Sequence, residues 1–169
     1  AVRRALFLAL NRRWMVDRLL QGQAVIANSV MPPGHWAACE SGESVPYDPQ
    51  QAQALLKEAG YVLGGDSPVR AKDGKSLAFT LLHPDDALHT QLAQIVQQNW
   101  AAIGVDVTLQ AVDYVTLVNE YLTPRHYQAA LVDLDMGNAA DPDPYPFWHQ
   151  SEALNGQNYA QWDNRPASE

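Results

Sequence analysis

The chain has 169 residues, of which 47% are hydrophobic and 18% charged, and its formal net charge is −8. This length and apolar content are sufficient for one domain with a buried core and exclude a disordered chain. The acidic balance argues against binding to nucleic acid or to anionic membranes, since both select basic surfaces. No apolar run is long enough to cross a bilayer, so we expect no membrane insertion of this segment.

The first sixty residues predict three helices, over 2–10, 12–20 and 48–59. Asn11 is a candidate N-cap for the second, and Asp48 followed by Pro49 is a strong start for the third. We expect a loop over 23–47, which contains the motif Met31-Pro-Pro-Gly-His-Trp36 and the single cysteine, Cys39. The chain opens inside a helical pattern without a cap, so we expect it to be part of a longer protein.

Glycines and a proline over 62–76 predict a turn or hairpin. The remaining pattern predicts strand, helix, strand, helix and strand, over 77–82, 88–103, 105–111, 113–122 and 127–134. This order implies crossover connections and three strands that run parallel. The sequence therefore predicts one α/β domain over 1–169, in which a parallel or mixed sheet is flanked by helices.

The residues that follow the last predicted strand form the most distinctive segment of the chain. Four carboxylates, three prolines and three aromatic rings lie within residues 133–148. Ligands of open α/β sheets bind just outside the carboxyl ends of the strands, where residues 83–86 and 112–114 are also expected. The ring of Trp36 is expected to form another side of the ligand site. The candidate ligand-binding residues are therefore Asp141, Asp143, Asp135, Trp148, Tyr145, His83, Asp85 and Trp36.

Several of these residues also have a purely structural interpretation. Asp85, Asp86 and Asp113 can be helix caps, and Trp148 can close the core instead of stacking on a ligand. The five histidines show no spacing typical of metal ligands and are interpreted as surface or loop residues. Asp133-x-Asp135-x-Gly is similar to the start of a calcium loop, but the twelfth position is Pro144 where that loop needs a glutamate. We predict no metal and no cofactor.

Sequence motifs of catalysis are missing: there is no Gly-x-Ser-x-Gly elbow, no P-loop and no Gly-x-Gly-x-x-Gly after a strand. We therefore expect a binding protein and not an enzyme. Two alternatives remain, namely a hydrolase that uses Asp141 and Asp143, and a ligand-sensing lobe of a transcription regulator.

An ordered set of motifs resembles the bacterial extracellular solute-binding proteins of family 5, the dipeptide, oligopeptide and nickel receptors of ABC importers. The set covers nearly the whole chain. Its members are Val2-Arg-Arg-Ala-Leu, Asn11-Arg, Met31-Pro-Pro-Gly-x-Trp36, Tyr47-Asp-Pro49, Leu55-Leu-x-Glu-Ala-Gly-Tyr61, Gln98-x-Trp100, Ile103-Gly-Val-Asp-Val107, Asp141-Pro-Asp-Pro144 and Asn158-Tyr-Ala-Gln-Trp162.

This resemblance implies that the chain is part of the second, C-terminal lobe of a two-lobed receptor. It implies a periplasmic or extracellular protein, often lipid-anchored to the cell surface, that traps a peptide or other small solute and delivers it to a membrane permease. We expect a monomer. Because one lobe leaves most of a ligand unburied, we predict that this chain alone binds no solute tightly.

The resemblance also points to particular residues. In peptide-binding members, the loop after the last strand carries an Asp that binds the amino group of the ligand. Aligned without a gap on Asp143-Pro144, that position is Ala140 here, with Asp141 beside it. Dipeptide binders hold the ligand carboxylate with an Arg after the first strand, and residues 83–86 contain none. An acidic site favours a cationic or neutral solute, with peptide as the default and oligosaccharide open.

Overall fold

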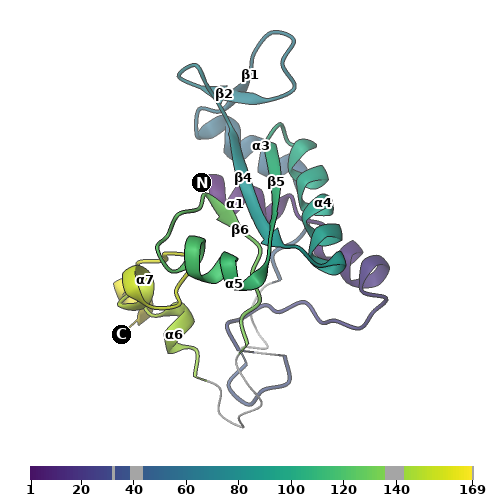
Figure 1. The fold of residues 1–169 in the computed structure, drawn as a ribbon. Coiled ribbons are helices and arrows are strands. Elements are labelled where there is room, and N and C mark those ends of the chain that lie inside the picture. Colours follow the sequence, from purple (N-terminus) through teal and green to yellow (C-terminus); the bar gives the residue numbers. More distant parts are fainter. Residues whose placement is uncertain (32, 39–43, 136–142, 169) are drawn as a thin grey trace.

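The computed structural model describes residues 1–31, 33–38, 44–135 and 143–168. The larger helices lie where the sequence predicts them (Figure 1). The helical elements are α1 (Val2–Leu8), α2 (Arg12–Trp14), the π-helix η1 (Met15–Leu19), α3 (Pro49–Glu58), α4 (Ala87–Ala101), α5 (Tyr114–Thr116), the π-helix η2 (Leu117–Leu122), α6 (Tyr145–Trp148), α7 (Glu152–Asn155) and α8 (Arg165–Ser168).

The central sheet consists of β4 (Ala78–Pro84), β5 (Asp106–Val112) and β6 (Ala129–Ala130), in the order β5-β4-β6. Both pairings are parallel, and the middle residue Leu81 is paired with Leu109 on one side and Ala129 on the other. The predicted parallel α/β arrangement is confirmed. All three strands therefore deliver their carboxyl ends to one edge, which lies at the lower end of the sheet in Figure 1.

The two faces of this sheet pack against different helices. Alternate residues of a strand point to opposite faces, so Leu81 and Leu82 belong to separate clusters. Leu81 packs with the large cluster that includes Leu8 of α1, Leu56 of α3 and Trp100 of α4. Leu82 packs with the smaller cluster formed mainly by η2. The result is a sheet between two helical layers, which holds the strand ends in place.

A second, antiparallel sheet lies beyond the amino ends of the central strands, at the top of Figure 1. It consists of β1 (Val62–Leu63), β2 (Arg70–Lys72) and β3 (Lys75–Ser76), where a turn or hairpin is predicted. Arg70 fastens this sheet to the body, because its Nε donates a hydrogen bond to the carbonyl oxygen of Ile103 (2.8 Å) and its Nη1 to that of Tyr61 (3.2 Å).

Four of the expected helix caps are present, whereas Asp85 only precedes the N-cap of α4, which is Asp86. Asn11, Asp48 and Asp113 each accept a hydrogen bond from the backbone amide three residues later, and Asp86 accepts from the amides of residues 88 and 89. Such contacts satisfy amides that have no partner inside the helix. The structural interpretation of Asp86 and Asp113 is therefore confirmed.

The last strand is shorter than predicted. The apolar pattern over 127–134 indicates a full strand, whereas β6 comprises only Ala129 and Ala130. The side chain of Gln128 explains the late start of the strand, because its Oε1 accepts from the amide of Thr80 (2.9 Å), a donor that a longer ladder would pair with a backbone carbonyl. After Ala130 the amide of Leu131 still donates to Leu82, and residues 131–135 then continue without strand structure. The pattern detects burial but not this replacement of a backbone partner by a side chain.

Candidate functional site

The residues that follow the three central strands meet at the carboxyl edge of the sheet. Asp86 follows β4, Tyr114 follows β5 and Asp133 follows β6. The hydroxyl of Tyr114 donates to the carbonyl oxygen of Asp133 (3.3 Å), which links the ends of β5 and β6 directly. The expectation that acidic strand ends share one edge is therefore met by Asp86 and Asp133.

His89, on the first turn of α4, lies between these two carboxylates. Its Nδ1 is 2.5 Å from Oδ2 of Asp86, and its Nε2 is 3.2 Å from both side-chain oxygens of Asp133. The imidazole is largely buried, with 14% of the side chain exposed, whereas 52% of Asp86 and 68% of Asp133 are exposed. One ring thus joins the loop after β4 to the chain after β6.

The electrostatics of this cluster follow from its geometry. Burial acts to lower the pKa of His89, but the hydrogen bonds and charges of Asp86 and Asp133 outweigh it and leave that pKa above its ordinary value. The pKa of Asp86 is lowered, first by the backbone amide of His89 and then by its ring. The pKa of Tyr114 is raised by burial and by the nearby charge of Asp133.

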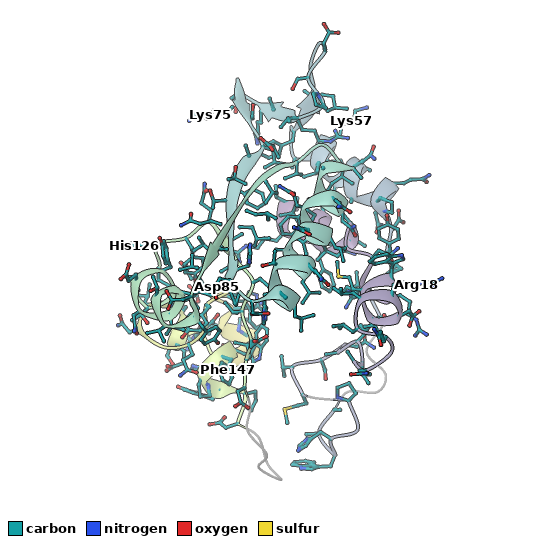
Figure 2. The ribbon with its side chains drawn as sticks, turned by 45° about the vertical axis from the view of Figure 1, so that its right-hand side comes forward. Arg18, Lys57, Lys75, Asp85, His126 and Phe147 are labelled. Atoms are coloured by element: carbon teal, nitrogen blue, oxygen red, sulfur yellow. The ribbon has the colours of Figure 1, made fainter. Side chains whose placement is uncertain are left out.

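The two candidate residues at the end of β4 differ in exposure. His83 is buried, with 2% of its surface exposed, and its Nδ1 donates to the carbonyl oxygen of Pro84 (2.7 Å). Asp85 is exposed at the edge of the sheet (Figure 2). The general interpretation of the histidines as surface or loop residues is wrong for His83, which is within a strand, and for His89, which is largely buried on a helix.

Asp143 and Tyr145 lie together on the way into α6. Both are exposed, and Oδ1 of Asp143 accepts a hydrogen bond from the amide of Tyr145 (2.9 Å). The ring of Tyr145 stacks on His149 with centroids 4.1 Å apart, and its hydroxyl is 3.0 Å from Oγ of Ser151. Local contacts therefore hold the tyrosine ring in a defined orientation.

Trp148 lies between two cavities and lines both of them. One cavity, of about 440 Å³, lies beside β6 and is also lined by Phe79, Trp100 and Tyr159. The other, of about 300 Å³, is lined by Phe7 and Arg12 together with residues 27–30. Trp148 itself is half-buried.

The remaining candidates lie in loops. Trp36 is 79% exposed, and its nearest described ring is His35, at a centroid distance of 5.4 Å. Asp135 is exposed two residues after Asp133. Asp141 lies outside the described residues. The loop that carries Trp36 and the chain after β6 both extend past the carboxyl edge of the sheet (Figure 1).

His89 is the site residue that the sequence prediction missed. The spacing Asp86-x-x-His89 at a helix start was available as a signal, since residues three apart lie on one helix face. The contact with Asp133, forty-four residues further on, has no such local signal.

Over the ranges that the structure describes, no group of three histidine, cysteine or acidic side chains is arranged to hold a metal ion. In the same ranges, no helix is both long enough and apolar enough to span a membrane. At this edge the carboxylates of Asp85, Asp86, Asp133 and Asp135 are exposed, and the hydroxyl of Tyr114 is bonded to the carbonyl oxygen of Asp133. Such carboxylates can accept a cation or a hydrogen-bond donor. The fold defines the class: a parallel α/β sheet flanked by helices, of the kind that binds ligands outside its strand ends.

Comparison with known proteins agrees with this class and narrows it. Residues 1–157 match the family model described as "Bacterial extracellular solute-binding proteins, family 5 Middle". Di/tripeptide-binding protein 1 of Pseudomonas aeruginosa is 28% identical over 162 residues, which is 95% of this chain and 28% of that protein. This chain therefore belongs to the family 5 solute-binding proteins and spans under a third of that relative.

Solved structures show the same relationship. Oligopeptide-binding protein AppA of Bacillus subtilis, in complex with a nonapeptide, superposes with a TM-score of 0.89 and 28% identity over 99% of this chain and 34% of that one. NikZ of Campylobacter jejuni, in complex with Ni(L-His), gives a TM-score of 0.82, with the same identity and coverage. The resemblance found in the sequence is thus confirmed at the level of family and fold.

Proposed function

We propose that the chain is part of the second lobe of an ABC importer's substrate-binding protein. The full-length parent captures a peptide or related small solute between two lobes and delivers it to a membrane permease. The observation that carries this proposal is the family match over residues 1–157. The convergence of the ends of β4, β5 and β6 supports it, because ligands of such sheets bind at that edge.

The central sheet supports the proposal that this chain forms only part of a lobe. The relatives named above are about three times longer than this chain. Among the described residues, β6 pairs only with β4, and the apolar cavity beside it is open to one side. A strand edge with an apolar surface beside it is normally covered in a finished protein. Further chain of the parent is the proposed cover.

The chemistry of the edge favours a solute with a positively charged group. Asp85, Asp133 and Asp135 are exposed there, and the segments 83–86, 112–114 and 131–135 contain no Lys or Arg. Asp143 is exposed just before α6 and is proposed to add to this acidic surface. The free amino group of a peptide meets this requirement, so peptide stays the default. Tyr145 and Trp148 offer ring surfaces to the rest of such a solute.

The parent is proposed to act outside the cytoplasm, since members of this family are described as extracellular. It is proposed to be anchored at the cell surface and to act as a monomer, with no catalytic activity and no cofactor. The isolated 169-residue chain is proposed to bind poorly, because one wall of the site gives little burial of the solute.

Calorimetry with the full-length parent tests this proposal. We expect tri-alanine to bind and N-acetyl-tri-alanine to bind at least tenfold more weakly, since acetylation removes the cation that the carboxylates accept. Asp143→Asn keeps an oxygen that can accept from Tyr145, so it removes only the charge. It should weaken tri-alanine binding about tenfold.

The matched control is Asp66→Asn, an exposed carboxylate in the hairpin region at the opposite end of the molecule. It should leave affinity unchanged. Equal binding of free and acetylated peptides would contradict the cationic solute. Turnover of generic ester, glycoside or peptide substrates, lost on Asp143→Asn, would contradict a receptor altogether.

A further inference from the structure

The contacts of His89 require a particular protonation state. Both ring nitrogens face carboxylate oxygens, Nδ1 towards Asp86 and Nε2 towards Asp133. An ionised carboxylate only accepts hydrogen bonds, and a neutral imidazole has one N–H donor. A neutral ring can therefore satisfy one of the two carboxylates and leaves its lone pair facing the other. Only the imidazolium ion donates to both at once.

These contacts span two strands that are far apart in sequence. Asp86 is the N-cap of α4 and is fixed by the backbone amides of Leu88 and His89. Asp133 lies three residues beyond β6, at the start of the chain that leads to Asp135 and on towards Asp143. His89 therefore couples a fixed point on α4 to a segment that, over the described residues 131–135, has no strand or helix of its own.

We propose that His89 is a positioning residue that clamps the chain after β6 to the start of α4, and that it does so only while its ring is protonated. In the clamped state the backbone of Asp133 is also held by the hydroxyl of Tyr114. The direction of Asp135, and with it the acidic edge offered to a solute, then depends on pH. This consequence for binding rests on the proposed function, whereas the clamp itself does not.

The other charged groups near α4 do not replace this pair. Asp85 and Asp113 lie at the same edge, and Asp113 is occupied as the N-cap of α5, where it accepts from Thr116. On the strands that α4 covers, His83 is bonded to Pro84 and Asp106 is exposed at the far end of β5.

The π-helix η1 also packs on α4, and it carries two charged residues. Asp17 is paired with Arg13 (2.8 Å), and Arg18 points into solvent (Figure 2). The carboxylates of Asp86 and Asp133 are the charges that raise the pKa of His89 above its ordinary value of about 6.5. The clamp should consequently open as pH rises above about 6.5 and through the raised pKa of His89.

The test uses the full-length parent and its variants His89→Gln and Asp133→Asn, with His126→Gln as matched control. His126 is an exposed histidine at the side of the molecule (Figure 2). The first measurement is the pKa of His89, obtained from deuterium exchange at the imidazole carbon and mass spectrometry. We expect Asp133→Asn to lower this pKa, and His126→Gln to leave it unchanged. An unchanged pKa in Asp133→Asn would overturn the clamp.

The second measurement is the affinity for tri-alanine between pH 5.5 and 6.5, where the termini of the peptide keep nearly all their charge. From pH 5.5 to 8.5 the same measurement is made with N,N,N-trimethyl-tri-alanine, whose cation does not titrate. We expect affinity to fall about fivefold as pH rises through the pKa of His89, a typical coupling between two sites. His89→Gln should abolish this slope and His126→Gln should keep it.

The two measurements separate the two proposals. Binding with the same pH slope in His89→Gln would overturn the positioning role of His89 and leave the receptor function intact. If neither peptide binds to any variant, the solute class of the proposed function fails. In that case the pKa of His89 in Asp133→Asn still tests whether the clamp exists.

Discussion

The two ends of the central sheet differ in the burial of their charged side chains. At the amino end, Arg70 is buried with 7% of its surface exposed, and its guanidinium donates to oxygens of Ile103, Tyr61 and Gln53. At the carboxyl end, Asp86 and Asp133 are more than half exposed and share one histidine. The guanidinium of Arg70 makes its hydrogen bonds within the protein. The carboxylates of Asp86 and Asp133 can still accept further hydrogen bonds.

This difference separates a structural end from the end that is proposed to bind the solute. A buried charge whose hydrogen bonds are all made within the protein fixes the local structure and offers nothing to a ligand. Carboxylates that remain exposed at the ends of parallel strands can accept further hydrogen bonds from a solute. Figure 2 shows this separation along the molecule, with Lys75 and Lys57 at the first end and Asp85 towards the other.

The largest predicted effect on the free energy of unfolding comes from removing the buried guanidinium of Arg70. Arg70→Met should destabilise the chain by about 3 kcal/mol, because carbonyl oxygens of Ile103 and Tyr61 lose their donors in a buried place. Urea unfolding measures this loss. Lys75→Met, an exposed change on β3, should stay within about 0.5 kcal/mol. Equal effects of the two would remove the distinction between the ends.

Gly104 tests how closely the amino end is packed. Its φ is +83°, and an added Cβ would lie 2.9 Å from Cγ of Arg70. We expect Gly104→Ala to cost about 2 kcal/mol, the sum of backbone strain and a displaced arginine. Gly74→Ala is the matched control, with a φ of +74° and open space around it, and should cost about 1 kcal/mol. The midpoint of urea unfolding compares them.

Arg125 holds the carboxyl-terminal helices as Arg70 holds the hairpin sheet. Its guanidinium donates to the carbonyl oxygens of Leu122 and Gly156 at 2.7 Å, and more distantly to those of Glu152 and Ala153. We expect Arg125→Met to cost about 1–2 kcal/mol, less than Arg70→Met, because the site is only partly buried.

The loss at Arg125 should be local. Hydrogen exchange should quicken over 145–160 and stay unchanged in α4. Arg18→Met, on an exposed helix face, is the control. It should leave hydrogen exchange unchanged both over 145–160 and in α4. Uniformly faster exchange would show that Arg125 supports the whole fold.

The smallest predicted effect is the pH dependence of the clamp. The pKa of His89 is raised in the folded chain, so its stabilisation is fully present below about pH 6.5 and is lost as pH rises through the folded-state pKa. The lowered pKa of Asp86 acts in the other direction, and its contribution is lost as pH falls through that lowered value.

Stability measured by urea unfolding should therefore fall as pH rises above about 6.5 and through the raised pKa of His89. His89→Gln should flatten this fall, and His126→Gln should retain it. A flat profile in the unaltered chain would show that the imidazole contributes no pH-dependent stability.

Local signals predicted most of the fold. The caps at Asn11, Asp48 and Asp113 lie where the sequence indicates, because a cap depends on residues within one turn. The alternation over 105–111 predicts β5 for the same reason. The prediction placed the start of β6 too early because the ladder there is replaced by Gln128, whose side chain bonds to a strand forty-eight residues away.

The candidate site could be predicted only in part. Parallel strands place their carboxyl ends together, so the edge and its exposed acids Asp85 and Asp135 follow from the pattern. Whether a given acid faces solvent or a partner does not follow, since Asp133 and Asp86 are joined through His89. The ligand-binding roles of the candidate residues stay predictions.

By itself, the sequence determined which segments are helices and strands, the parallel sheet and the family. These features arise from hydrophobic periodicity, helix caps and ordered motifs, which can all be recognised from the order of the residues alone. Only the tertiary structure decided that His83 is buried, that Trp148 lies between two cavities, and that His89 meets Asp133. Those outcomes depend on which side chains come together in space, a relation that no local pattern encodes.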